Sequence, residues 1–466
     1  MDTKQLKQKI LDLAIRGKLV PQDPNDEPAS VLLERIRKEK EQLIAAGKLK
    51  KSKAKASDTP HYENVPFEIP ASWEWVALKD VCTKFSTGPF GSMLHKSDYS
   101  SEGVPVVNPA NIVNGQINID KIMYVKKEKS LELSKYNLFL NDILLARRGD
   151  LSKCAIATSE NIGWLCGTGS FVLHLCLIES YYFKLIYATQ YIQSILATAS
   201  VGATMDNLNQ DTFSKILIPI PPLEEQKRII NGVHEWYNLI DSIDTNKKEL
   251  SKAIEETKSR VLSLAISGKL VSQSPTDEPA IELLKRINPA FKPCDTSHYE
   301  NLPHGWTIST VGEVAKYSNG RAFKPSEWQK EGLPIIRIQN LNDNDAQFNY
   351  TTATFEDRYK VKDGDLLFAW AASLGTYIWQ GGDAWLNQHI FRVEPAAFMD
   401  KSFLYYSLQN LIAEFYRQSH GSGMVHITKG KFENTPILIP PLAEQKRFVK
   451  AIEKVFSQLD NITAEL

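Results

Sequence analysis

The sequence contains two copies of the same series of short blocks, and this internal repeat is the strongest constraint on how the chain can fold. Five blocks recur in the same order: ILDLAIRGKLV (10–20) as VLSLAISGKLV (261–271), DPNDEPASVLLERI (23–36) as SPTDEPAIELLKRI (274–287), HYENVP (61–66) as HYENLP (298–303), GVPVVNPANI (103–112) as GLPIIRIQNL (332–341), and ILIPIPPLEEQKRI (216–229) as PILIPPLAEQKRF (436–448). Such a repeat predicts two equivalent structural units in tandem, each about half of the chain.

The repeat begins and ends at an unusual point, because the chain opens with one connector block and closes with the other. LAIRGKLV stands near the N-terminus and PPLAEQKR near the C-terminus, whereas in the middle PPLEEQKR (221–228) leads into LAISGKLV (264–271). The two ends together therefore equal a split copy of the central connector. If they meet in space, connectors and heads alternate about a pseudo-two-fold axis.

The central connector has the pattern of one long helix from Leu223 to Ile266. Pro221 and Pro222 mark its start and Gly268 marks its end. Segments 4–16 and 441–464 carry similar stripes. At ~1.5 Å per residue the central helix would be a rod of about 65 Å. The repeat favours a structural spacer, although a stripe of this kind also fits the core of an ordinary helical bundle. Its apolar residues are mostly three or four positions apart, as in a coiled coil: Leu223, Ile230, Val233, Tyr237, Ile240, Ile243, Leu250, Ile254, Val261 and Leu264.

We expect an α+β fold with two similar globular heads that are joined and spaced by long antiparallel helices. Short β-like runs bounded by turn residues occur in both heads, among them VPVVN, NDILLA, LPIIRI and LLFAW. KLKKSKAK at 48–55 is expected to be a solvated linker rather than a DNA contact. The expected domains are an N-terminal helical segment with a basic linker (1–60), head 1 (61–220), the central connector (221–290), head 2 (291–440) and a C-terminal helical segment (441–466).

Composition narrows the class of protein without deciding its function. Because 55 basic residues balance 55 acidic ones, the zero net charge neither favours nor excludes a nucleic-acid partner. Five scattered cysteines without a CxxC pair argue against a disulfide framework and against a zinc site. The sequence shows no signal peptide and no apolar run of membrane-spanning length. We therefore expect a cytoplasmic, multi-domain protein that has no membrane partner and binds no metal.

Motifs for bond chemistry are missing. The string nearest to an adenine-methyltransferase loop is NPAN (108–111), which lacks the second proline and the aromatic residue. The sequence has no phosphate-binding loop of the GxxxxGK[ST] type. EWQK (327–330) lacks the acidic partner that a nuclease site needs, and neither STGPFGS (86–92) nor HGSGM (420–424) precedes a recognisable helix as a Rossmann loop does. The sequence therefore predicts a binding protein rather than an enzyme.

Polar and basic residues of the heads are the candidate DNA contacts, since Arg can bind guanine and Asn or Gln adenine through two hydrogen bonds, while Lys more often holds phosphate. Taken one at a time, each of them also fits a solvated surface residue. In head 1 the candidates are Lys96, Asn108, Asn111, Arg147, Arg148 and Lys153. In head 2 they are Arg321, Lys324, Arg337, Gln339, Asn340, His426, Lys429 and Lys431.

Two pairs of candidates align within a repeated block. Asn108 corresponds to Arg337 and Asn111 to Asn340, in a shared apolar frame. The frame would be scaffold, and the differing polar residue would let the two heads read different bases. Asn111 and Asn340 equally fit turn residues. The aligned strings VGATMDNL (201–208) and GSGMVHIT (421–428) are expected to be structural turns rather than DNA-facing loops.

The chain resembles the specificity subunits of Type I restriction-modification enzymes. LIPIPPLEEQKRI and LIPPLAEQKRF resemble the closing motif of their target-recognition domains. The head openings from Pro70 to Trp73 and from Pro303 to Trp306, each followed by G-[VL]-P-[VI]-[VI], are also similar to that family. The layout of head, helix, head and helix matches it over essentially the whole chain.

The resemblance implies a non-catalytic subunit that reads double-stranded DNA. Each head would bind one half of a split site, and the helices would fix the gap between the halves. The connectors would dock two modification subunits, which use S-adenosylmethionine, and two restriction subunits would use ATP and magnesium; this chain itself would bind no cofactor. The candidate docking stripe on the helices is Leu223, Ile230, Val233, Tyr237 and Ile240.

Two other classes of protein remain open at this point. One is a self-contained methyltransferase or nuclease with degenerate motifs. The other is a duplicated scaffold or carbohydrate-binding protein with aromatic-rich heads, in which Trp73, Trp306, Trp370 and Trp385 would stack on sugars, although aromatic residues of this kind are more often core residues.

Overall fold

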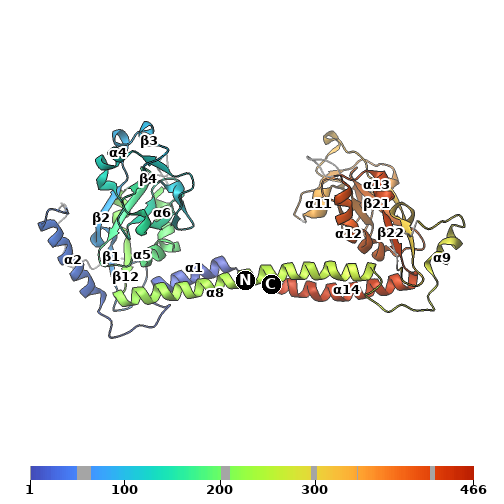
Figure 1. Cartoon of the computed structure of the whole chain (residues 1–466), viewed down its shortest axis with the longest axis horizontal. Helices are drawn as coiled ribbons and strands as arrows, with labels where there is room; N and C mark the ends of the chain where they lie inside the picture. Colours follow the sequence, from blue (N-terminus) through green and yellow to red (C-terminus); the bar gives the residue numbers. More distant parts are fainter. Residues whose placement is uncertain (1, 50–64, 201–209, 295–301, 344, 420–425) are drawn as a thin grey trace. The chain divides into compact units, whose positions relative to one another are not determined.

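The computed structural model describes residues 2–49, 65–200, 210–294, 302–343, 345–419 and 426–466 (Figure 1). The chain separates into two compact units, Met1–Asn246 and Lys247–Leu466. Each unit holds one copy of every repeated block. The boundary between the units therefore falls inside the central helix, and each unit consists of a head with a helix on either side of it in the sequence.

Unit 1 runs from the N-terminal helix to the middle of the central helix. Its helices are α1 (Thr3–Ile15), α2 (Ala29–Ala45), α3 (Leu78–Val81), α4 (Lys127–Glu132), α5 (Ser180–Tyr187), α6 (Gln190–Ser200), α7 (Gln210–Ser214) and the first part of α8 (Leu223–Ile266), with short 3-10 turns η1 (Gly91–Met93), η2 (Lys96–Asp98), η3 (Pro109–Asn111), η4 (Ser134–Tyr136) and η5 (Ser159–Asn161). Its strands are β1 (Glu74–Ala77), β2 (Cys82–Thr87), β3 (Tyr99–Ser100), β4 (Val104–Val107), β5 (Ile112–Val113), β6 (Gln116–Ile117), β7 (Met123–Val125), β8 (Ile143–Ala146), β9 (Cys154–Ile156), β10 (Leu165–Cys166), β11 (Ser170–Leu175) and β12 (Leu217–Ile220).

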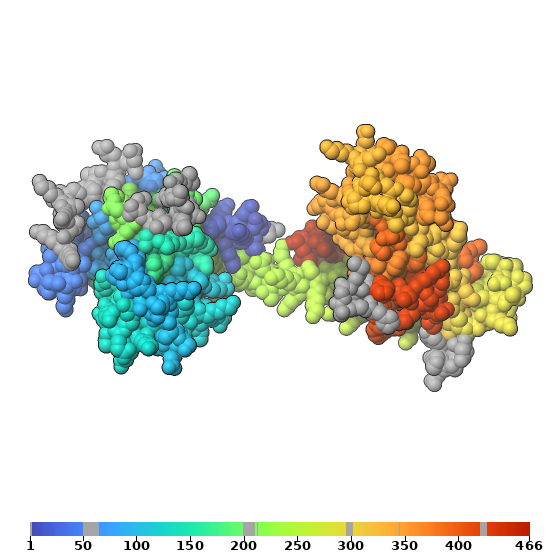
Figure 2. All heavy atoms as spheres, turned by 90° about the horizontal axis from the view of Figure 1, so that it is seen from above, coloured from blue at the N-terminus to red at the C-terminus, as the bar shows by residue number. Residues whose placement is uncertain are grey.

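Head 1 is built around an antiparallel sheet with strand order β2-β11-β8-β9. Because side chains alternate along a strand, Phe171 packs with the helices, where it stacks on Phe213 of α7 at 5.9 Å, whereas Val172 packs on the other face with Val107 and Cys166. Those two residues belong to a second sheet, β10-β4-β7-β3. The blue-to-teal segment with β3, β4 and β7 forms much of the surface of head 1 in Figure 2.

Unit 2 repeats this series of elements. Its helices are the second part of α8, α9 (Ala280–Ile287), α10 (Val311–Val314), α11 (Ile338–Asn342), α12 (Lys401–Gln418), α13 (Lys429–Glu433) and α14 (Leu442–Glu465), with 3-10 turns η6 (Pro325–Glu327) and η7 (Asp357–Tyr359). Its strands are β13 (Thr307–Thr310), β14 (Ala315–Asn319), β15 (Leu333–Ile336), β16 (Asn349–Thr351), β17 (Lys360–Val361), β18 (Leu366–Ala369), β19 (Gly375–Ile378), β20 (Ala384–Leu386), β21 (Ile390–Pro395) and β22 (Pro436–Ile439).

Head 2 has the same two sheets as head 1. Strands β14-β21-β18-β19 form the antiparallel sheet, and β16-β15-β20-β17 form the second one. In both heads the repeated G-[VL]-P-[VI]-[VI] block forms a strand, β4 or β15, that pairs parallel with one neighbour and antiparallel with another. In both heads the first and last strands close the domain as an antiparallel pair, β1 with β12 and β13 with β22. The α+β expectation and the duplication are confirmed.

The helical predictions are confirmed almost to the residue. The central helix runs from Leu223 to Ile266, and Gly268 follows it with a φ of +72°. A side chain at Gly268 would be strained by this φ and would also lie 2.7 Å from the ring of Pro303. The runs VPVVN, NDILLA, LPIIRI and LLFAW contain β4, β8, β15 and β18.

The apolar stripe of α8 in unit 1 is covered by the unit itself. Val233 and Ile240 are buried in one core cluster with Leu11 of α1, and Leu223, Ile230 and Tyr237 pack against that cluster. Lys7 of α1 forms an ion pair with Asp241 at 2.5 Å. Of the five residues expected to dock partner subunits, Val233 and Ile240 are therefore buried within the unit, whereas Leu223, Ile230 and Tyr237 are partly buried, and their docking role stays a prediction.

In unit 2 the second part of α8 packs against α14. Val261 shares a core cluster with Phe448 and Ile452, and Lys258 forms an ion pair with Asp460 at 2.7 Å. Leu250 and Leu264, which the sequence places in the apolar seam, are instead exposed. Their spacing fits the seam, but the helix packs through Leu262 and Ala265 on a neighbouring stripe.

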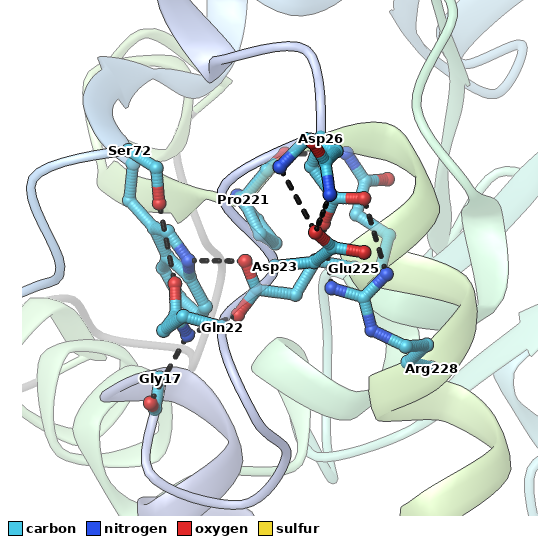
Figure 3. A network of polar contacts seen from close by, with 11 residues as sticks. Gly17, Gln22, Asp23, Asp26, Ser72, Pro221, Glu225 and Arg228 are labelled. Carbon is cyan, nitrogen blue, oxygen red and sulfur yellow. Dashed lines mark hydrogen bonds and ion pairs between the residues drawn. The ribbon is translucent and has the colours of Figure 1, made fainter.

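The repeated blocks meet where helix and head join (Figure 3). In unit 1 the buried carboxylate of Glu225 accepts hydrogen bonds from Trp73 Nε1 at 2.9 Å and from Gln22 Nε2 at 2.5 Å. One turn further along α8, Arg228 pairs with Asp26 at 2.5 Å. The head-opening tryptophan, the DEP block and the EQKR block, which are far apart in the sequence, therefore form one polar joint.

Unit 2 builds the equivalent joint from the second copies of these blocks. Glu444 accepts a hydrogen bond from Trp306 Nε1 at 3.0 Å, and Arg447 pairs with Asp277 at 2.6 Å. The neighbouring glutamines, Gln226 and Gln445, are fully buried and bond to the backbone. Both joints therefore use the motif Glu-Gln-Lys-Arg in the same way.

Within the described ranges, the chain contains no helix that is long and apolar enough to span a membrane. Of the basic stretch 48–55, residues 50–55 lie outside these ranges, as do residues 201–208 and 421–425 of the two aligned turn strings.

Candidate nucleic-acid interface

The ends of four strands come together at one edge of head 1. The backbone N–H of Gly88, after β2, donates to Ser170 O at 3.0 Å, and the backbone N–H of Arg147, after β8, donates to Gly169 O at 2.9 Å. Gly167, after β10, donates to Val107 O at 2.8 Å. The approach is so close that a Cβ on Gly88 would lie 1.9 Å from Gly167 O, so only glycine fits there. We call this region, with Asn108 and Lys153, the strand-end edge of head 1.

Three predicted residues carry their polar groups at this edge. Asn108 follows β4, and its side chain contacts the backbone of Gly167 and the hydroxyl of Tyr99. Lys153 donates to Pro109 O at 3.0 Å and so ties the β8–β9 hairpin to the turn after β4. Arg147 is half-buried, and Arg148 beside it is exposed. The fold therefore brings together candidate residues that lie up to 45 positions apart in the sequence.

Head 2 has an equivalent edge, defined by Asn319, Gly320, Arg337, Trp370 and residues 387–389. The backbone N–H of Asn387 donates to Ile336 O at 3.1 Å, and the backbone N–H of Trp370 donates to His389 O at 3.1 Å. The backbone of Gly167 and of Arg147 makes the equivalent bonds in head 1. A Cβ on Gly320 would lie 2.2 Å from Asn387 O, as Gly88 approaches Gly167. The backbone frame is thus shared, whereas the side chains that it presents differ.

A family model described as the Type I restriction modification DNA specificity domain matches residues 70–252 and 303–466. The chain belongs to this family. Among relatives of this specificity subunit, the EcoAI subunit of Escherichia coli is 29% identical over 72% of this chain and 67% of its own length. The EcoEI subunit of the same organism is 27% identical over 99% of this chain and 90% of its own length.

Two solved structures share the fold of this specificity subunit. The HsdS subunit from Thermoanaerobacter tengcongensis is 20% identical and aligns with a TM-score of 0.56 over 86% of this chain and 93% of its own. A chain solved in a study of complex assembly and conformational transition of the type I R-M system aligns with a TM-score of 0.57 at the same identity, over 86% and 94% of the two chains. At this level of identity the likeness describes the fold alone.

Two candidates of the specificity subunit are scaffold rather than surface. Asn111 and Asn340 are 4% and 7% exposed, and each accepts a hydrogen bond at 3.1 Å from the backbone N–H three residues earlier, of Asn108 and Arg337. Each therefore closes the turn that follows β4 or β15. Because the side chains are buried and bonded, they are turn residues and not base contacts, although neither adopts the left-handed backbone.

Arg321 is present near the edge of head 2, but its charge is compensated. It pairs with both carboxylate oxygens of Glu327 at 2.6 and 3.0 Å and lies between the rings of Phe323 and Phe355. Hydrogen bonds from Arg321, and then from the backbone of Lys324, lower the pKa of Glu327 to about 2. Since this carboxylate stays charged at neutral pH, Arg321 is not an uncommitted cation, whereas Lys324 is exposed.

The remaining candidates are spread over other elements. Lys96 lies in η2 and Gln339 in α11, and both are exposed. Lys429, in α13, lies 3.5 Å from Glu433, and Lys431 donates to Gln418 O at 2.9 Å. His426 is exposed and forms a backbone bridge with Ala371, directly after Trp370. This bridge brings His426 next to the edge of head 2.

Sequence reasoning missed the residues that distinguish the edge of head 2. Trp370 donates its indole N–H to Asn319 Oδ1 at 3.0 Å, and its ring lies 5.1 Å from that of His389, which contacts Gln388. A signal for Trp370 is present in the sequence, because NDILLAR (141–147) aligns with GDLLFAW (364–370) and gives Trp370 the position that Arg147 has in head 1. The run LLFAW predicts a strand, however, and its apolar last residue does not point to DNA binding.

Proposed function

We propose that this specificity subunit reads a split DNA sequence, one half with each strand-end edge, and that it performs no bond chemistry itself. The observation that carries the proposal is the shared frame with different side chains. Asn108 and Arg337 follow equivalent strands, β4 and β15, and Arg147 and Trp370 follow β8 and β18, so two equivalent heads hold different donors and rings at the same places. Base edges in the major groove are distinguished by this kind of donor pattern.

The chemistry would come from partner subunits. Two modification subunits would transfer methyl from S-adenosylmethionine to adenine N6, and two restriction subunits would use ATP and magnesium to translocate and cut unmodified DNA in the cytoplasm. The helices would set the distance between the two half-sites. Joining both heads in one chain raises the effective concentration of the second contact once the first has formed.

We place the docking face for the modification subunits on the exposed flank of α8, beside the stripe through Val233 and Ile240. Trp236 and Leu239 are three residues apart on this helix, which places them on one face, and they are 46% and 51% exposed. We expect the double substitution Trp236→Ala and Leu239→Ala to weaken co-purification with the modification subunit by at least tenfold. Leu131→Ala is the matched control, because Leu131 is 67% exposed on head 1.

The proposal is tested by co-expressing the chain with its modification subunit and mapping N6-methyladenine by long-read sequencing. The expected result is one motif with two halves and a fixed gap. Replacing residues 302–440 by the same head of a related subunit should change one half and leave the other half and the gap intact. Co-purification without any methylated split motif, or a head exchange that alters both halves, would contradict the proposal.

A further inference from the structure

Arg147 and Trp370 occupy the same place in the two heads. Each is the first residue after the equivalent strand, β8 or β18. The backbone N–H of each donates to the carbonyl of the residue just before β11 or β21, at 2.9 and 3.1 Å. Each also lies on the equivalent phenylalanine. The Arg147 guanidinium is 5.6 Å from the centre of the Phe171 ring, and the Trp370 ring is 5.9 Å from that of Phe391. One head therefore presents a cation where the other presents an indole.

The guanidinium of Arg147 is uncommitted within the part of the chain that the structure describes. No carboxylate there forms an ion pair with it, and its Nε is buried without a hydrogen-bond partner. Burial and the neighbouring charge of Arg148 lower its pKa. Arg321 and Arg392 differ from it, because each is paired with a glutamate. An arginine held over a ring without a counter-ion is available to a ligand with two acceptors side by side.

The segment that faces Arg147 carries smaller side chains than the equivalent segment of head 2. The facing segment in head 1 is Gly167, Thr168 and Gly169, whereas the same segment in head 2 is Asn387, Gln388 and His389. Arg147 therefore faces backbone and one short side chain. The planar guanidinium matches O6 and N7 of guanine, which lie side by side in the major groove, and a phosphate at this place would be bound without information about sequence.

We infer that Arg147 reads a guanine in the half-site of head 1 and that Trp370 removes guanine reading from the same position of head 2. The inference rests on the proposed function, since it assigns bases to the same two edges. In head 2 the indole N–H is occupied by Asn319, so the ring offers an apolar face rather than a donor pair.

The test compares wild type, Arg147→Ala and Arg147→Lys, each co-expressed with the modification subunit, by mapping N6-methyladenine. The half that persists when head 2 is exchanged is the half of head 1. That half should contain a guanine on one strand whose position becomes degenerate in both variants, while the other half and the gap persist. Loss of a bidentate pair of about 1–3 kcal/mol corresponds to a roughly 5- to 150-fold weaker binding of the matched duplex. Binding of an unrelated duplex should change little.

Lysine separates the two readings of this residue, because it preserves a phosphate contact but not the paired donors. An unchanged motif in Arg147→Lys, with all duplexes weakened equally in Arg147→Ala, would show a phosphate contact and overturn the inference. A wild-type half-site of head 1 without guanine would also overturn it. Arg35→Ala is the matched control and should keep the motif, because it removes an exposed ion pair between Arg35 of α2 and Glu27. If wild type methylates no split motif, the proposed function itself fails, and this outcome differs from both.

Discussion

The two units build the same joint between helix and head, but they treat its buried carboxylate differently. In unit 1 both oxygens of Glu225 accept a hydrogen bond, from Trp73 and from Gln22. In unit 2 Trp306 bonds one oxygen of Glu444, and the other oxygen is buried without a partner among the described residues. Gln273, which aligns with Gln22, is exposed. The repeat has thus preserved the geometry of the joint and not its full set of hydrogen bonds.

This difference shows which parts of the joint are common to both copies. Trp73 and Trp306 are buried, and the ion pairs Arg228–Asp26 and Arg447–Asp277 have nearly the same geometry. The hydrogen bond from Gln22 to Glu225 belongs to unit 1. There Gln22 also accepts a hydrogen bond from the hydroxyl of Ser72 and donates one to the carbonyl of Gly17 (Figure 3). At the position of Ser72, unit 2 has Gly305, which has no hydroxyl to donate.

The largest expected effect is loss of the tryptophan. Trp73→Ala removes a buried ring and leaves Glu225 with one donor fewer, so the free energy of unfolding of unit 1 should fall by about 3–5 kcal/mol. Trp306→Ala should do the same to unit 2. Hydrogen exchange followed by mass spectrometry measures each unit separately. If Trp73→Ala accelerated exchange equally in α14 and in α1, the two joints would not be independent.

A smaller effect should have opposite signs in the two units. Glu225→Gln replaces one acceptor by an amide N–H₂, which then faces either Trp73 Nε1 or Gln22 Nε2, so unit 1 should lose about 1–2 kcal/mol. Glu444→Gln keeps the acceptor for Trp306 and removes a buried charge whose second oxygen is unpaired, so unit 2 should gain up to about 1 kcal/mol at pH 7. Denaturant unfolding of the two variants measures both values. A loss in both units would break the comparison.

The smallest effect is on pH dependence. Burial is the largest cause that raises the pKa of Glu225 and of Glu444. Because the folded pKa lies above the unfolded one, each carboxyl contributes stability while it is protonated. This contribution is lost as the pH rises through the raised value. The melting temperature of wild type relative to Glu444→Gln should therefore fall as the pH rises above about 4.5, the ordinary value for glutamate. A difference that stayed constant over this range would show that the pKa is not shifted.

The sequence predicted the architecture well because its signals are local or repeated. The spacing of Val233, Ile240 and Val261 sets the helix, and the two aligned blocks at β4 and β15 set the sheet frame. It did not predict the joint, since Trp73 and Glu225 are 152 residues apart and only the fold brings them together. The recurrence of these blocks showed that they belong together but not which atoms bond.

The site was predicted in part, and its errors have one physical cause. A sequence shows residue types, but not what covers them. Asn111 and Asn340 have the chemistry of base readers yet close buried turns, and the stripe through Val233 has the chemistry of a docking surface yet packs on α1. Arg147, a candidate DNA contact from the sequence, lies at the edge of head 1, whereas the equivalent Trp370 was not among the candidates, because the chemistry of an indole points first to a core.

The central claim is that two equivalent frames present two different reading edges, and one measurement tests it directly. A chain in which residues 65–220 also replace residues 302–440 would carry head 1 twice. Co-expressed with the modification subunit, it should methylate a site whose two halves have the same sequence, one half on each strand. The gap between the halves should equal the gap in the site of wild type. A site that retained the original second half, or one with a single half and no fixed gap, would contradict the claim.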